Sequence, residues 1–165
     1  AGSPMHLAIE AINASTGSNI LHVPYKGGPP AALDAMSGEV DMVAIGLPTA
    51  YGYVKAGRLK PLALLQRKRS SLLPDVPTVA EVTGKDAIDF QGWRGLFAPG
   101  KTDGSIVQTI GSAVGEALQD QTVRQRLIDA AIEPAFASPK ALSEVLVRQS
   151  DLMIKAMADA DRKPR

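Results

Sequence analysis

The segment that most constrains this chain runs from His22 to Pro48 and reads HVPYKGGPPAALDAMSGEVDMVAIGLP. Residues 20–23 are apolar and partly β-branched, as in a buried strand. A Gly-Gly-Pro-Pro turn and a short helix ended by Gly38 follow, and a second apolar segment, Met42–Gly46, then runs into Gly-Leu-Pro. This order predicts a strand–loop–helix–strand unit with two parallel strands. In open α/β sheets, ligands bind at the ends of such strands.

Composition removes several classes of function. The chain has 165 residues, a net charge of +1 and no cysteine. The small net charge argues against bulk attraction to nucleic acid or anionic lipid, and the lack of cysteine excludes disulfides, thiolate nucleophiles and cysteine-bound metals. No apolar run approaches the roughly 20 residues of a membrane span. No signal peptide is visible, and we expect the opening Ala-Gly-Ser-Pro to lie within a fold.

Local signals predict the remaining elements. Ser3-Pro4 is a helix start and Gly17 a helix stop, and Thr78 with Glu81 has the spacing of a capping box. The last third is helical, with a second Ser-Pro start at Ser138. The other predicted elements are helices Pro30–Ser37 and Ala50–Ala56, a strand Pro61–Leu65 and a long crossing strand Ile88–Ala98.

The two histidines are the first candidates for chemistry. A nucleophile–base pair of Ser3 and His6 lacks an orienting acid, an oxyanion site and a Gly-x-Ser-x-Gly elbow. A capping serine on a helix N-terminus can instead help to bind an anion. His22 is interpreted as a core or interface histidine, and with no third ligand at metal spacing we expect no metal and no cofactor.

The loop after the first predicted strand is the second candidate. Gly27-Gly28 has neither dinucleotide-binding nor Walker spacing, so its glycines are interpreted as a tight turn that exposes backbone N–H groups. Lys26 either steers an anion or is solvated. Tyr25 either walls a pocket and donates its hydroxyl, or only packs.

Three further features carry weaker predictions. The basic run Arg67-Lys68-Arg69 is expected to be a solvated surface loop, because nucleic-acid binding needs more charge and nearby aromatic residues. Trp93 is expected in core or hinge packing. Arg94 is expected to pair with an acid across two lobes.

Motifs along nearly the whole chain resemble the Bug family of periplasmic solute receptors, the binding components of tripartite tricarboxylate transporters. The start is similar to the family's Gly-Ser-x-x-His-Leu-Ala, and residues 22–27 match its His-Val-Pro-Tyr-Lys-Gly. The other matching segments are Gly38-Glu39-Val40-Asp41, Leu73-Pro74-Asp75-Val76-Pro77-Thr78, Gly92-Trp93-x-Gly95 and Ala98-Pro99.

The resemblance implies an α/β fold of two lobes around a cleft, a two-lobed periplasmic-binding-protein-like architecture that here lacks its N-terminal portion. Residues 1–91 would form the second, inner lobe, which is incomplete. Residues 92–165 would supply a crossing strand and the C-terminal helices of the first lobe. It also implies a periplasmic, non-enzymatic receptor for a small carboxylate or dicarboxylate, with membrane transporter subunits as partners and no nucleic acid. The implied ligand-binding residues are Ser3, Pro4, Met5, His6, Tyr25, Lys26, Gly27, Gly46, Leu47 and Pro48.

The chain also departs from the family pattern, because the usual family chain is nearly twice as long and a proline usually opens the helix where Asp103-Gly104 stands. Two alternatives therefore stay open: a hydrolase that uses Ser3, His6 or His22, and a truncated relic without ligand binding. Strands apolar on both faces also predict that this chain self-associates, because they lack partners.

Overall fold

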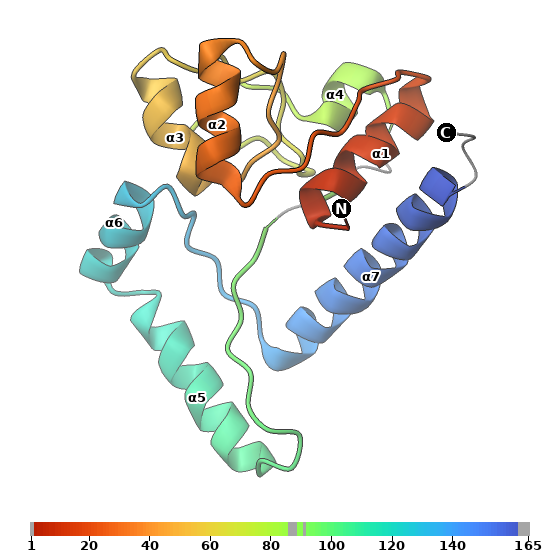
Figure 1. Cartoon of the computed structure of the whole chain (residues 1–165). Helices are drawn as coiled ribbons and strands as arrows, with labels where there is room; N and C mark the ends of the chain where they lie inside the picture. The colour runs from red at the N-terminus through yellow and green to blue at the C-terminus, as the bar shows by residue number, and fades with distance from the viewer. Residues whose placement is uncertain (1, 86–88, 91, 162–165) are drawn as a thin grey trace.

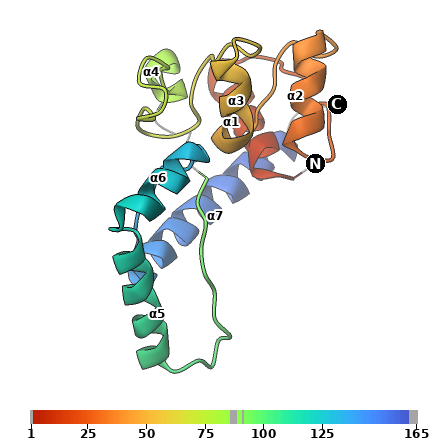
Figure 2. The ribbon, with the colours of Figure 1, turned by 90° about the vertical axis from the view of Figure 1, so that its left-hand side faces the viewer.

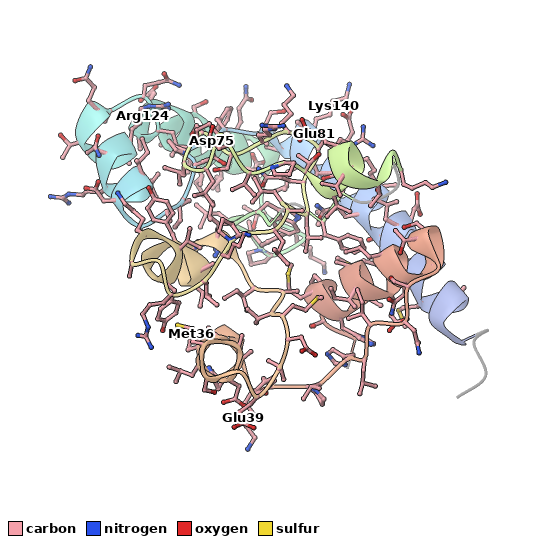
Figure 3. All side chains as sticks on the ribbon, turned by 90° about the horizontal axis from the view of Figure 1, so that it is seen from above. Met36, Glu39, Asp75, Glu81, Arg124 and Lys140 are labelled. Carbon is pink, nitrogen blue, oxygen red and sulfur yellow. The ribbon has the colours of Figure 1, made fainter. Side chains whose placement is uncertain are left out.

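The computed structural model describes residues 2–85, 89–90 and 92–161 as helices joined by extended segments. Figures 1 and 2 show α1, α2, α3 and α4 gathered in an upper layer, with α5 and α6 reaching below it and α7 running beneath α1. Seen from above in Figure 3, Met36 and Glu39 lie at the opposite edge from Arg124 and Lys140. The helices are α1 Pro4–Thr16, α2 Gly28–Ser37, α3 Leu47–Lys55, α4 Val79–Thr83, α5 Gly104–Ala117, α6 Gln121–Asp129 and α7 Pro139–Asp161.

The predicted end signals of α1 and α4 are confirmed. The Ser3 side chain accepts the His6 N–H at the start of α1, and Gly17 ends it at φ +73°. That positive φ suits glycine, which has no Cβ to clash. At α4, Thr78 and Glu81 each accept the other's backbone N–H in a complete capping box. Both ends are determined by bonds within one turn, which is why the sequence alone predicts them.

Two helices begin earlier than predicted. We expected starts at Pro30 and Ala50, but α2 begins at Gly28 and α3 at Leu47. In both cases a proline occupies the first turn, where its missing N–H has no intrahelical acceptor to lose. At α5, where the family resemblance leads us to expect a proline, the helix is instead capped by Asp103. The Asp103 side chain accepts the Ser105 N–H at 2.7 Å.

The predicted strands do not form a sheet among the described residues. Segments 20–23, 42–46 and 61–65 are extended, and the described residues hold only an isolated parallel bridge between Leu64 and Thr78. A third segment joins there, because Phe90 N–H donates to the Leu65 carbonyl at 2.9 Å. A strand is defined by pairing, and an extended segment without a neighbouring ladder stays a loop. Residues 88 and 91 of the predicted crossing strand lie outside the described residues.

The expectation that these segments are buried strands is not met, and part of their apolar surface is uncovered, as the expected lack of partners predicts. Leu21 is 85% exposed and Leu62 is 62% exposed. Leu96 and Phe97, in the crossing segment, are exposed to a similar degree. An apolar side chain is buried only when another element covers it, and the sequence pattern does not say whether that element is present.

The core is small and joins distant parts of the chain. It centres on Leu7, Ala8, Val79 and Phe90, and Met153 of α7 packs against this cluster. Residues from both sides of position 91 therefore share one core, and the division into lobes at 91 and 92 stays a prediction. Among the described residues, no helix combines the length and apolarity that a membrane span requires.

Candidate functional site

The first turn of α1 holds four of the ten predicted residues, from Ser3 to His6. Ser3 Oγ accepts the His6 backbone N–H at 3.3 Å, and the Gly2 N–H donates to His6 Nδ1 at 3.1 Å. Ser3 and Pro4 are exposed, whereas Met5 is half-buried. The serine oxygen thus caps the helix, and its hydroxyl hydrogen remains able to donate to an anion.

His6 and His22 lie against each other. Their ring centroids are 4.1 Å apart, and Glu10 Oε1 lies 3.8 Å from His6 Nε2. Burial lowers the pKa of His22, helped by the charge of His6, while Glu10 acts to raise it. The two strongest family-like motifs, residues 2–8 and 22–27, are therefore in direct contact.

This geometry bears on two sequence hypotheses. Both ring nitrogens of His6 face groups other than the Ser3 hydroxyl, namely the Gly2 N–H and Glu10. The Ser3–His6 nucleophile–base pair of the hydrolase alternative is therefore not formed. Among the described residues, no three His, Cys, Asp or Glu side chains gather as a metal site.

Asn13 places the histidine pair, and sequence reasoning missed it. This residue of α1 is 3% exposed. Its Nδ2 donates to the Ile20 carbonyl at 3.0 Å, and its Oδ1 accepts the Ile20 N–H at 2.9 Å. The segment that leads to His22 is thereby bound to α1. A lone polar residue inside an apolar helical face was the available signal, because a buried amide needs partners.

Tyr25 is tied to α2 rather than free. Its hydroxyl donates to Asp34 Oδ2 at 2.7 Å, and this hydrogen bond to a carboxylate is the main reason that its pKa is raised. The structure therefore fixes this hydroxyl on α2, and the ligand-binding role of Tyr25 stays a prediction. Lys26 is exposed and makes no ion pair with any described residue. No sequence signal pointed to Asp34.

The starts of α2 and α3 touch each other. A Cβ added at Gly28 would lie 3.2 Å from Thr49 Cγ2 and 3.4 Å from Ile45 Cγ2, so glycine permits this approach. The N-cap residues, Gly27 and Gly46, have no side chain to cap the first N–H groups. Figures 1 and 2 show the first turns of α1, α2 and α3 on the same lower side of the upper layer. This places three positive helix ends on one side.

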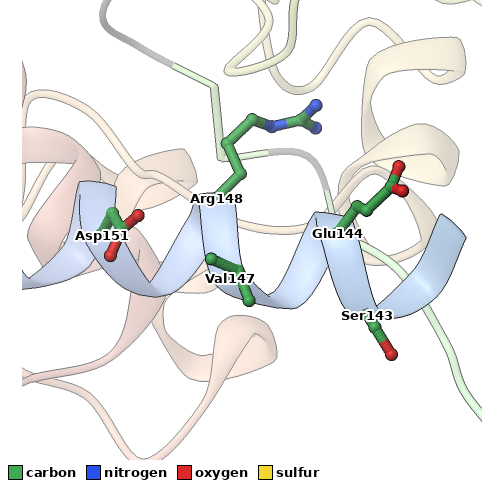
Figure 4. Close-up of a pocket in the computed structure, with 5 residues that line it drawn as sticks. All are labelled: Ser143, Glu144, Val147, Arg148 and Asp151. Carbon is green, nitrogen blue, oxygen red and sulfur yellow. The ribbon is translucent and has the colours of Figure 1, made fainter. Parts of the chain in front are cut away.

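Six of the ten predicted residues are exposed, and Met5, His6, Tyr25 and Leu47 are half-buried. Two hollows are defined, one of about 450 Å³ over α7 (Figure 4) and one of about 370 Å³ around Asp89. None of the ten predicted residues lines either hollow. The structure therefore brings Ser3–His6 to His22, and the start of α2 to that of α3.

Comparison with known proteins places the chain among transport receptors. The family model described as "Tripartite tricarboxylate transporter family receptor" (TctC) matches residues 1–158. A protein from the clcB–clcD intergenic region of Pseudomonas knackmussii is 33% identical over 78% of this chain and 76% of its own length. Protein BugT of Bordetella pertussis is 33% identical over 84% of this chain and 42% of its own length.

Solved structures are similar over nearly the whole chain. The structure of an R. palustris protein with adipate has a TM-score of 0.81 and 29% identity, covering 96% of this chain and 53% of that one. A TctC solute-binding protein from Polaromonas without ligand has a TM-score of 0.76 and 28% identity, covering 98% and 55%. The predicted fold class, part of a periplasmic solute-binding architecture, is confirmed. The chain spans about half the length of these solved relatives.

Proposed function

This chain belongs to the tripartite tricarboxylate transporter receptor family, and on that premise we propose that it takes part in capturing a small carboxylate or dicarboxylate for uptake. The family is one of transport receptors and not of enzymes. The observation that carries the proposal is that the first turns of α1, α2 and α3 lie on the same lower side of the upper layer. The R. palustris relative described with adipate supports a dicarboxylate as the ligand class.

The anion would be bound mainly by backbone groups. Helix N-termini carry partial positive charge and N–H groups without intrahelical acceptors. At α2 and α3, Gly27 and Gly46 leave these groups uncovered by any capping side chain. The Ser3 hydroxyl and the exposed Lys26 ammonium add a donor and a positive charge. The ten predicted residues are kept as the proposed ligand-binding set.

The proposed setting is the periplasm. The structural relatives include a periplasmic transporter protein, and family members serve tripartite transporters. We propose membrane subunits of such a transporter as the partners that accept the ligand from this receptor. The chain spans only part of its relatives, so this proposal concerns its share of the binding surface.

Calorimetric titration with adipate tests the proposal, with the uncharged diamide adipamide as the control ligand. Ser3→Ala removes one hydroxyl donor to the anion, and we expect it to weaken adipate binding by about 1–3 kcal/mol. Ser112→Ala, at an exposed position of α5, is the matched control and should leave binding unchanged. Equal affinities of wild type and Ser3→Ala would remove Ser3 from the site. Equal binding of adipate and adipamide would contradict carboxylate capture.

Gly46→Val tests the approach to α3. Gly46 has φ −65° and ψ 144°, which valine adopts, and an added Cβ would meet only Pro48 Cδ at 3.8 Å. The variant should therefore keep the wild-type circular dichroism and melting temperature while its side chain blocks a ligand from the backbone. A folded Gly46→Val protein with undiminished adipate affinity would exclude this helix start from the site.

A further inference from the structure

The basic loop at Arg67, Lys68 and Arg69 does more than face solvent. It forms one wall of a hollow of about 370 Å³, a volume within the range of small-ligand sites. The other walls come from Asp89, from Glu133 after α6, and from Arg148 of α7. Four cations and two acids thus meet where four separate parts of the chain converge, and the loop, exposed as expected, also contributes to this hollow.

One of the lining side chains is a buried carboxylate. Asp89 is 2% exposed. Its Oδ2 accepts a hydrogen bond from Arg67 Nε at 3.0 Å and lies 3.4 Å from Arg148 Nη2. Its Oδ1 is also buried and has no hydrogen-bond partner among the described residues. An ionised oxygen removed from water without a donor is costly, so this atom points to a donor that the described chain does not supply.

The four basic side chains around Asp89 differ in whether they already have a partner within the chain. Arg69 is held by Glu81 at 3.0 Å and by the Pro74 carbonyl at 3.1 Å. Lys68 makes no ion pair with any described residue. The Arg67 and Arg148 side chains are 62% and 49% exposed. Each therefore has one nitrogen close to Asp89 while much of the side chain stays in contact with solvent. In Figure 4, Arg148 extends from α7 on the side away from Ser143.

We propose that this hollow binds a small zwitterion of the α-amino acid class. The ligand's ammonium donates to Asp89 Oδ1, and its carboxylate pairs with the guanidinium of Arg67 or Arg148 and with Lys68. An α-amino acid carries its two charges on neighbouring groups, and the Asp89–arginine pair presents the opposite charges next to each other. Charge-assisted hydrogen bonds of this kind are the strong ones.

Entry of the ligand follows from exposure. Asp89 Oδ1 is closed to bulk water, whereas the two arginine side chains are about half exposed. One guanidinium moves from Asp89 Oδ2 onto the ligand's carboxylate and uncovers Oδ1, to which the ammonium then donates, so every charge stays paired. This site shares no residue with the proposed carboxylate site, and either one can fail without the other.

Calorimetry with three probes tests the proposal on the whole chain: glycine, acetate and methylammonium, the last two carrying one of glycine's charges each. We expect glycine to bind at least tenfold more tightly than either. Asp89→Asn keeps the size of the side chain and removes its charge, and it should weaken glycine binding at least tenfold. Asp75→Asn, at an exposed acid labelled in Figure 3, is the matched control and should change nothing.

Equal affinity for glycine and acetate would overturn the proposal, as would the absence of binding at millimolar glycine. If Asp89→Asn loses the wild-type circular dichroism spectrum, Lys68→Met decides, because Lys68 is exposed and unpaired and its loss should not disturb folding. Several-fold weaker glycine binding by Lys68→Met, with Lys101→Met unchanged, supports the site. Unchanged glycine affinity in Lys68→Met overturns it.

Discussion

Helices α1 and α5 are of similar length and are both capped by a side chain, yet their surroundings differ completely. In α1, Leu7, Ala8 and Asn13 are buried, and α7 packs along the helix. In α5 no residue is buried, and Ile106 and Ile110 are 52% and 45% exposed. The apolar spacing of the two helices is alike, so the difference comes from what lies beside them. Helix formation is decided within the segment, whereas burial is decided by partners.

The largest expected effect comes from truncating a buried side chain of α1. Leu7 is 4% exposed. Leu7→Ala loses the free energy gained by moving the deleted apolar groups out of water, and it leaves a cavity. We expect a loss of about 2–5 kcal/mol in the free energy of unfolding, measured by urea titration. Ile110→Ala on α5 is the matched variant and should cost well under half as much. Equal costs would show that α5 is covered in solution.

The exposed side of the comparison predicts self-association. Leu96 is 73% and Phe97 is 70% exposed, and the extended segment that holds them has unpaired backbone groups. Such surfaces attract a second copy of the same chain. Light scattering on a size-exclusion column should give a mass at least twice the 17.3 kDa of the chain. Phe97→Ser should lower it, and a monomer with a sharp cooperative melt would contradict the prediction.

Asn13 sharpens the comparison from the polar side. Asn13→Ala leaves the half-buried Ile20 N–H and carbonyl without their partners, which should cost about 1–3 kcal/mol of unfolding free energy. It should also release His22 from His6, visible as a shift of the histidine ring signals in NMR spectra. Asn19→Ala, at an exposed neighbour, is the control. Unchanged ring signals in Asn13→Ala would show that the contact between His6 and His22 does not depend on Asn13.

The smallest expected effect concerns pH. The pKa of His22 is lowered in the folded chain, so the unfolded chain binds more protons as the pH falls below the ordinary histidine value. The contribution of His22 to stability is therefore fully present above that value and is lost as the pH falls through the folded-state pKa. Melting temperatures at about pH 8 and about pH 5 measure the effect, and His22→Gln should reduce the difference. An identical pH dependence in both proteins would contradict it.

Neither the partner of Asp89 nor that of Tyr25 was visible in the sequence. Asp89 meets Arg67 and Arg148 from positions 22 and 59 residues away, and Tyr25 meets Asp34 across a loop. Such pairs depend on how elements pack and not on local spacing. The ten predicted site residues came from the family resemblance. The structure brings part of that set together through Asn13, which sequence reasoning did not single out, and through the close approach of α3 to Gly28.

What the sequence determined by itself was local. Ser3, Pro4 and Gly17 bound α1, and Thr78 with Glu81 starts α4, because caps act within one turn. The motif order also led to the right family. Tertiary structure alone decided which apolar segments are buried: residues 63–65 meet α4 and Phe90, whereas Leu21 and Leu62 stay in water. The physical reason is that strand pairing and burial each need two surfaces in contact. The sequence of one segment describes its own surface and not the surface of its partner.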